Sequence, residues 1–341
     1  MSRYLEKDFL CSYDLSIGFF NNIGVKVKDV QPLRKVFILK TEEGDKILKK
    51  VDYDQNKINF IEKSLKYINK TYPNTMRLNK FSNEENYIKW KDEFYIVMDK
   101  IIGIEASCTN PIDLEICAKS IAKLHKASKG LKNSLEKENS MVIMGEDLAK
   151  LYSEAREDLL EIKKFVCSYK YKNEFDNLFI ENVDRYVKEI EECERLLSKS
   201  NYNNMKNDED ILALCHNDLA HHNFLIENGE VNIIDFDYSS INLRCVDLSD
   251  LILKWIKNSA FDIDKAKFII DSYDEVNPIR KDELELIKIL LAFPRDIYSI
   301  IRVYYHKEKS WEYESYLNKF KVKLENDIYR KSFLKEYNEK I

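Results

Sequence analysis

Residues 215–226 read CHNDLAHHNFLI, and residues 231–238 read VNIIDFDY. Each stretch contains a short apolar run, and an Asn-Gly pair between the two runs predicts a tight β-hairpin turn. The loop before the first strand of this hairpin carries Asp218 and Asn223, and Asp235 lies at the end of the second strand. The three polar side chains can therefore converge in space although the chain separates them.

Two carboxylates and an amide at one place suit phosphoryl transfer. One carboxylate takes the proton of an acceptor hydroxyl, while hard oxygen ligands hold Mg²⁺ against the phosphates. On this interpretation Asp218 is the catalytic base, and Asn223 and Asp235 are metal ligands. Asp237 is either a further carboxylate near the metal or a structural partner of the loop.

The composition limits the classes of function. The chain has 341 residues, of which 34% are charged, and its net charge is only −5. That length allows two lobes, each with its own core. A generic nucleic-acid surface needs a dense basic excess, so we predict no nucleic-acid partner.

The cysteines and the first residues indicate a cytoplasmic protein. Seven cysteines are scattered without a C-x-x-C pair, which is typical of reduced thiols and disfavours structural zinc. The chain begins without the apolar run of a signal peptide, and no stretch approaches the ~20 apolar residues of a membrane span. We therefore expect cytoplasmic synthesis and no membrane partner.

Hydrophobic periodicity predicts an α+β fold with two lobes. A small N-terminal antiparallel-sheet lobe comprises residues 1–100, and a larger, mainly helical C-terminal lobe comprises residues 101–341, with the boundary near 99–106. The N-terminal elements are, in order, a helical lead-in (1–24), strands with a hairpin at Gly44 (25–52), a helix (55–70) and further strands (75–105). Helices in the second lobe are predicted from residue 110 and over 146–166, 175–199, 246–258, 264–273, 281–291, 294–305 and 310–337.

The polar signature resembles that of a known family. His-x-Asp-x-x-x-x-Asn from His216 to Asn223, with Ile-Asp-Phe-Asp over 234–237, resembles the catalytic signature of aminoglycoside phosphotransferases and choline kinases. The full strings are more similar still to the CotS family of bacterial spore coat proteins, which share that kinase-like fold. Residues 121–128 resemble the helix that precedes the catalytic region, and residues 246–249 resemble the Asp-Leu that follows it.

The resemblance implies a protein-kinase-like fold with ATP and Mg²⁺ in the cleft between the lobes. It also implies a lysine on a strand of the first lobe that contacts phosphate oxygens. Lys49 fits best, and Lys46 and Lys50 are neighbours that could replace it. Glu62, on the helix that follows, is the predicted acidic partner of this lysine. The hinge that offers backbone groups to adenine would consist of Met98, Asp99 and Lys100.

One departure from protein kinases leaves the function open. No G-x-G-x-x-G precedes the lysine strand, and residues 31–35 occupy the corresponding turn. The first alternative is a phosphotransferase that acts on a hydroxyl acceptor within the spore coat program of sporulation. The second is a non-catalytic coat protein that binds other spore coat proteins. The third is a cytoplasmic small-molecule kinase of the choline, homoserine, methylthioribose or aminoglycoside type.

The remaining polar residues of the signature have simpler interpretations. We expect His216 to be a buried anchor of the loop, and the adjacent His221 and His222 to point in different directions rather than bind zinc. Asp247 and Asp250 would cap or brace their helix. Acidic residues in the acceptor pocket would favour a cationic acceptor, but the sequence does not tell which of them face the cleft.

Overall fold

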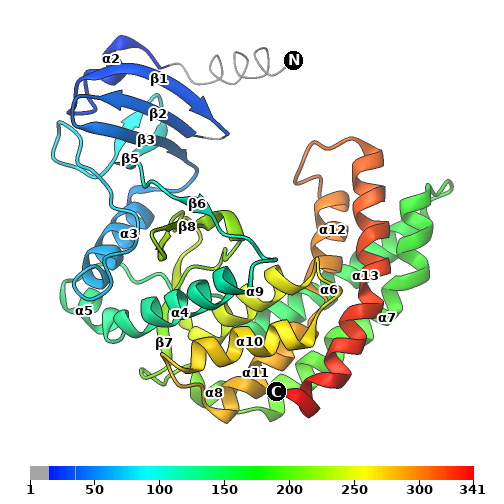
Figure 1. Ribbon diagram of the computed structural model, residues 1–341. Coiled ribbons are helices and arrows are strands. Elements are labelled where there is room, and N and C mark those ends of the chain that lie inside the picture. Colours follow the sequence, from blue (N-terminus) through cyan, green and yellow to red (C-terminus); the bar gives the residue numbers. More distant parts are fainter. Residues whose placement is uncertain (1–14, 35) are drawn as a thin grey trace.

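The chain folds into two lobes, one built on a β-sheet and the other mainly helical (Figure 1). The computed structural model describes residues 15–34 and 36–341. Part of the predicted lead-in over residues 1–24 lies outside the described residues. The described part contains the short helix α2 (Ile17–Phe20). The predicted fold class is confirmed.

The N-terminal lobe contains a five-stranded antiparallel sheet in the order β1-β2-β3-β5-β4. The predicted hairpin is present, because Thr41 pairs with Gly44, whose φ of 107° suits glycine alone among common residues. The strands are β1 (Val27–Leu33), β2 (Val36–Thr41), β3 (Gly44–Val51), β4 (Ile88–Trp90) and β5 (Glu93–Asp99).

The last strand of this lobe, β5, is buried on both faces. Tyr95 and Val97 pack in a small core with Phe19, whereas Ile96 and Met98 belong to the large core that continues into the helical lobe. Successive side chains of a strand point to opposite faces, so this apolar run fills two cores at once. The same large core contains the apolar face of α3 (Gln55–Ile68), which follows β3 as predicted.

The predicted helices of the second lobe are present, with their ends shifted by a few residues. Asn110 caps the first of them by accepting a hydrogen bond from the N–H of Ile112 at 3.1 Å. The helices are α4 (Pro111–Ala127), α5 (Leu131–Lys137), α6 (Leu148–Ser168), α7 (Glu174–Lys199), α8 (Tyr202–Met205), α9 (Arg244–Ile256), α10 (Ile263–Asp274), α11 (Lys281–Ala292), α12 (Arg295–Tyr305) and α13 (Tyr313–Lys340).

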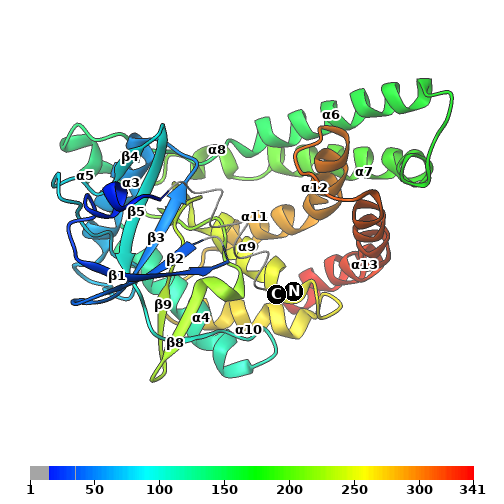
Figure 2. The same cartoon turned by 90° about the horizontal axis from the view of Figure 1, so that it is seen from above.

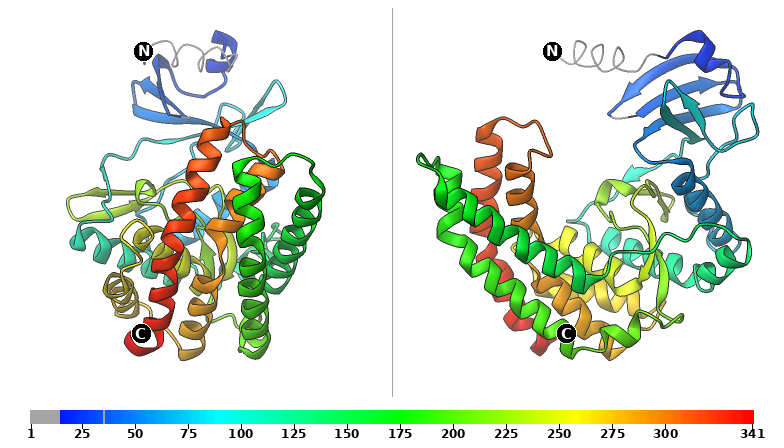
Figure 3. Two further views of the ribbon diagram at one scale, coloured as in Figure 1. Left: turned by 90° about the vertical axis from the view of Figure 1, so that its right-hand side faces the viewer. Right: turned by 180° about the vertical axis from the view of Figure 1, so that it is seen from behind.

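The long helices of the second lobe lie away from the sheet. Seen from above, α6 and α7 run side by side on the far side of the molecule (Figure 2). Seen from behind, α12 and α13 rise opposite the strand-rich lobe (Figure 3). Among the described residues, no helix combines the length and apolar character needed to cross a bilayer.

Short strands join the lobes around the signature. β7 (Leu212–Cys215) pairs with β10 (Ser240–Leu243), and β8 (Phe224–Glu227) lies between β6 (Ile104–Glu105) and β9 (Glu230–Ile233). The predicted turn between β8 and β9 is confirmed, because Asn228 and Gly229 both have positive φ, of 52° and 81°. The N–H of Ile233 donates to the carbonyl of Asn74 at 3.0 Å, so the hairpin is hydrogen-bonded to the N-terminal lobe.

Candidate active site

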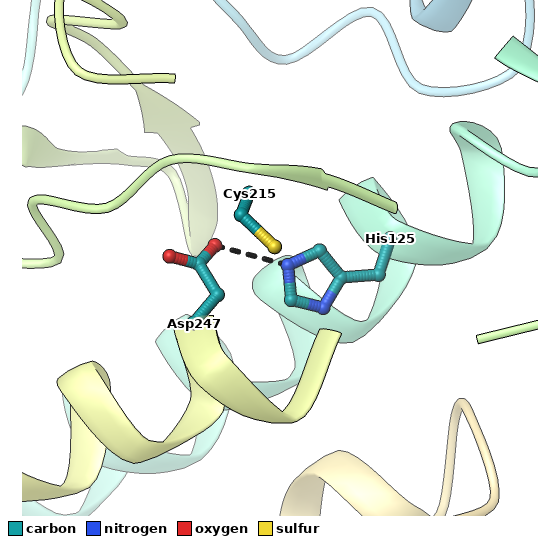
Figure 4. Close-up of side chains that lie close together, drawn as sticks. All are labelled: His125, Cys215 and Asp247. Atoms are coloured by element: carbon teal, nitrogen blue, oxygen red, sulfur yellow. Dashed lines mark hydrogen bonds and ion pairs between the residues drawn. The ribbon is translucent and has the colours of Figure 1, made fainter. Parts of the chain in front are cut away.

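The loop between β7 and β8 carries two of the predicted site residues, Asp218 and Asn223, and one buried carboxylate holds its first half. Asp247, in the first turn of α9, accepts hydrogen bonds from the backbone N–H groups of His216 and Asn217, both at 2.8 Å. Its carboxylate also lies 3.0 Å from Nε2 of His125 on α4 (Figure 4). Burial alone would raise the pKa of Asp247, but the hydrogen bond with His125 and the nearby donors outweigh it and lower that pKa.

His125, Cys215 and Asp247 are also the one group of described residues whose polar atoms lie close enough to share a metal ion (Figure 4). Those atoms already have partners. His125 Nδ1 lies 2.8 Å from the hydroxyl of Tyr273, and Cys215 Sγ donates to the carbonyl of Leu243 at 3.4 Å. Burial raises the pKa of Cys215 well above its usual value, whereas zinc binds the thiolate. The group is therefore a structural anchor beneath the loop.

Of the histidines of the signature, His216 is the buried loop anchor that the sequence predicts. His216 is fully buried, and its Nε2 lies 2.8 Å from the carbonyl oxygen of Ile234. Its Nδ1 accepts a hydrogen bond from the N–H of Asp218 at 3.2 Å. His216 thus ties the loop to the end of β9. The rings of His221 and His222 are nearly perpendicular, at 85°, and belong to no metal-binding group of the described residues.

The second half of the loop is held by the same helix. The N–H of Leu219 donates to Asp250 at 3.0 Å, and the indole N–H of Trp255 donates to the carbonyl of Leu219 at 3.0 Å. The amide of Asn223 donates to the carbonyl of Asp218 at 2.8 Å, which closes the loop on itself. Asp247 and Asp250, predicted to brace their own helix, instead fix the backbone on both sides of Asp218.

The side chain of Asp218 points to a cation that the sequence did not reveal. Lys254, on α9, forms an ion pair with Asp218 and also lies 2.9 Å from Asp250. The spacing of Asp250 and Lys254 is i,i+4, which places both on one helix face and could have suggested this pair. No local pattern links either residue to Asp218, because that contact depends on how α9 packs under the loop.

On the other lobe, the structure brings Lys49 to the end of the hairpin. Its Nζ lies 2.7 Å from Asp235 and 2.7 Å from Asp237, and the hydroxyl of Tyr53 donates to Asp237 at 2.8 Å. Burial alone would lower the pKa of Lys49, but the two carboxylates outweigh it and raise that pKa. These contacts span the two lobes and fix Lys49, rather than a neighbouring lysine, at the site.

The other lysines of β3 face elsewhere, and the predicted partnership with Glu62 does not form. Lys46 pairs with Asp99 at 2.6 Å, and Lys50 pairs with Glu93 at 2.8 Å. No ion pair joins Glu62 to Lys49 in the described part of the chain. The physical reason is that both carboxylates of the 235–237 stretch already lie against the Lys49 ammonium.

The predicted metal ligands are brought together by strand pairing. Phe224 pairs with Ile233 in the β8–β9 ladder, and the N–H of Ile234 donates to the carbonyl of Asn223 at 3.0 Å. Asn223 therefore lies beside the end of β9, from which Asp235 projects. Asp235 has a φ of 68°, a strained conformation for this residue that is often found at functional sites.

The predicted hinge lies where β5 ends beside the start of β3. Met98 pairs with Ile47 across the sheet, and the N–H of Lys100 donates to the carbonyl of Asp45 at 3.1 Å. Met98 is buried, whereas Asp99 is largely exposed. The segment therefore passes from the sheet towards the helical lobe.

Known proteins share this fold and sequence pattern. A model of the family described as choline/ethanolamine kinase matches residues 105–277, about half of the chain. The chain belongs to the choline/ethanolamine kinase family. This match includes the loop, the hairpin and α9.

The chain is also similar in sequence to a spore coat protein. It is 23% identical to spore coat protein S of Bacillus subtilis over 314 residues, which cover 91% of this chain and 89% of that protein. The expected resemblance to spore coat proteins with a kinase-like fold is thus confirmed.

Solved structures match the fold of this chain over nearly its whole length. An aminoglycoside phosphotransferase from Alicyclobacillus acidocaldarius has a TM-score of 0.81 at 17% identity, covering 95% of this chain and 96% of that one. Spectinomycin phosphotransferase in complex with ADP and spectinomycin has a TM-score of 0.65 at 16% identity, covering 93% and 95%. At these identities the likeness establishes the fold alone.

We predict that Asp247→Asn destabilises the protein by about 3 kcal/mol, because an amide cannot accept both backbone hydrogen bonds while facing His125. Urea unfolding at pH 7 measures this loss. The carboxyl has a lowered pKa in the folded state, so its contribution is complete above about pH 4 and is lost as pH falls through the folded-state pKa.

The matched control is Asp264→Asn, because Lys340 is its one ion-pair partner in the part of the chain that the structure describes and Asp264 is 78% exposed. This variant should leave the urea concentration at the midpoint of unfolding nearly unchanged. Equal midpoints for Asp247→Asn and the control would contradict the anchoring role of Asp247.

Proposed function

We propose that this protein is an ATP- and Mg²⁺-dependent phosphotransferase that acts on the hydroxyl group of an acceptor. The observation that carries this proposal is the convergence of Lys49 from the first lobe with Asp235 and the anchored loop of Asp218. Membership of a kinase family supports it. We assign nucleotide binding to residues 1–100 and acceptor binding to residues 101–341.

The donor set fits a magnesium site. The side-chain NH₂ group of Asn223 donates to the backbone carbonyl of Asp218. The side-chain oxygen of Asn223 is therefore left to face elsewhere. Asp235 is 37% exposed and can offer a carboxylate oxygen. Oxygen ligands of this type suit Mg²⁺, which would neutralise charge on the phosphates. Asp237 is bound by Lys49 and Tyr53, which favours a supporting role for it.

The remaining steps belong to side chains of this chain. Asp218 accepts the proton of the acceptor hydroxyl as its oxygen attacks the γ-phosphorus, and the bond to the β–γ bridging oxygen breaks to release ADP. Lys254 orients the carboxylate of Asp218. Lys49 contacts phosphate oxygens. Backbone groups of the hinge, Met98 to Lys100, receive the adenine, except the N–H of Lys100, which donates to Asp45.

A structural role in the spore coat is the second candidate. The observation that favours it is the match to spore coat protein S over 91% of this chain. In that case the protein would bind other coat proteins, and the site would be an inherited scaffold. If the protein is a phosphotransferase, assembly of the spore coat should depend on the charge of Asp218. If its role is structural, coat assembly should not depend on that charge.

We predict that Asp218→Asn lowers ADP release in the presence of an acceptor by about 10²–10⁴-fold, because the amide cannot take the proton. Coupled ADP detection measures this rate. Stabilisation of the variant by MgATP should persist. A variant that is as fast as wild type would refute the assignment of Asp218 as base, and spores that assemble normally with it would favour the structural role.

We predict that Asp235→Asn abolishes the Mg²⁺-dependent part of nucleotide binding while the fold is kept. A ligand at 100 times its Kd stabilises a protein by about 2.7 kcal/mol, so the wild-type melting temperature should rise with MgATP. The variant should show little rise. Glu62→Gln serves as the control, because Glu62 does not contact Lys49, and an equal loss in both variants would contradict the site as described.

A further inference from the structure

A cavity of about 490 Å³ lies between the end of α9, α12 and α13. Its lining includes the apolar side chains of Phe293, Ile300, Val303 and Trp311. This volume suits a small organic ligand. Most of the lining residues belong to α12 and α13, which rise opposite the strand-rich lobe in Figure 3.

The cavity is joined to Asp218 by a chain of ion pairs. Arg295, in its wall, lies 2.9 Å from Asp250, which lies 2.9 Å from Lys254. Lys254 in turn pairs with Asp218. Leu253, the residue before Lys254 on α9, also lines the cavity. The helix that holds the proposed base therefore forms a wall of this cavity.

Positive charge dominates the lining. Among the described residues that line the cavity, the acidic ones are Asp296 and Asp327, and the basic ones are Lys257, Arg295, Lys309, Lys319, Lys323 and Arg330. Both arginines are paired with carboxylates, Arg295 with Asp250 and Arg330 with Asp327 and Glu189. The surplus is therefore carried by the four lysines.

Two of these lysines share a single carboxylate, and the other two lie against an aromatic ring. Lys257 and Lys323 both lie 3.6 Å from the same oxygen of Asp296. Lys309 and Lys319 lie over the ring of Trp311, at 5.1 and 4.9 Å from its centroid, and pair with no carboxylate within residues 15–34 and 36–341.

The titration behaviour agrees with an uncompensated surplus. Burial and the repulsion from Lys257 lower the pKa of Lys323 despite its contact with Asp296. Burial alone would raise the pKa of Asp296, but Lys323, Lys257 and Arg295 outweigh it and lower that pKa. An anion entering the cavity would relieve the repulsion between the lysines, whereas a cation would increase it.

We propose that this cavity is the acceptor site and that it takes a small anionic hydroxyl compound, one that carries a carboxylate or a phosphate group. The assignment rests on the proposed phosphotransferase function. It departs from the expectation that acidic residues would select a cationic acceptor, and from choline and ethanolamine, the cations in the description of the family. Lys257 and Lys323 bind the anionic group.

A series of sugars built on the same ring tests the charge preference. The probes are glucuronate, glucose 6-phosphate, neutral glucose and cationic glucosamine, with choline as a further cation. Calorimetry measures binding to the full chain without nucleotide, and ADP release with MgATP measures transfer separately. We expect at least one anionic probe to bind tenfold or more tightly than glucose, and both cations to bind more weakly than glucose. The carboxylate and phosphate probes identify which group is preferred.

The double variant Lys257→Gln/Lys323→Gln should reduce this preference about tenfold. The matched control is Lys321→Gln/Lys335→Gln, because both lysines lie on α13 but do not line the cavity. It should leave the preference unchanged.

Three results would overturn the proposal. They are no binding of either anion, binding of a cation that equals or exceeds that of the anions, and an equal loss of the preference for anions in the control variant. Anion binding that depends on Lys257 and Lys323 without any ADP release would uphold the cavity as an anion site. In that case the proposed phosphotransferase function, on which its role as acceptor site rests, would fail instead.

Discussion

The structure of the site depends on one buried carboxylate. Asp247 has no exposed surface, and its two oxygens receive the backbone N–H groups at the start of the loop while facing His125. A buried charge is stable only when its hydrogen bonds are complete. The loop must therefore keep one conformation, which includes the positive φ of 62° at Asn217. This constraint decides where Asp218 projects.

From that anchor, hydrogen bonds and ion pairs made by α9 extend in two directions. Towards the loop, Asp250 and Lys254 hold Leu219 and Asp218. Towards α12, Asp250 holds Arg295 and thus the wall of the basic cavity. One helix therefore positions both the group proposed to take a proton and the surface proposed to bind the molecule that loses it. Such shared support can fix their mutual geometry without further contacts.

The sequence was sufficient for the architecture and for the residues that a motif makes visible. Periodicity placed the strands and helices, and the turn at Asn228 located the hairpin. Lys49, which the resemblance assigns to contact with phosphate oxygens, is the lysine of β3 that reaches the hairpin, and its contact with phosphate stays a prediction. The role of each site residue in catalysis stays a prediction.

What the sequence left out are contacts made by packing. Lys254 meets Asp218 across 36 residues, and Asp237 rather than Glu62 lies against Lys49. Neither contact follows from local spacing, because each depends on which faces of two distant elements meet. The charge of the acceptor cavity is a case of the same kind. The lobe contains many acidic residues, and only the packing of α9, α12 and α13 determines that lysines line the cavity.

The central claim is that the site binds nucleotide together with a divalent ion. Calorimetric titration of the unmodified protein with a non-hydrolysable ATP analogue, with and without Mg²⁺, tests it most directly. We predict one site per chain and an affinity that rises at least tenfold when Mg²⁺ is present. The absence of binding under both conditions would contradict the account and leave a kinase-like scaffold without kinase chemistry.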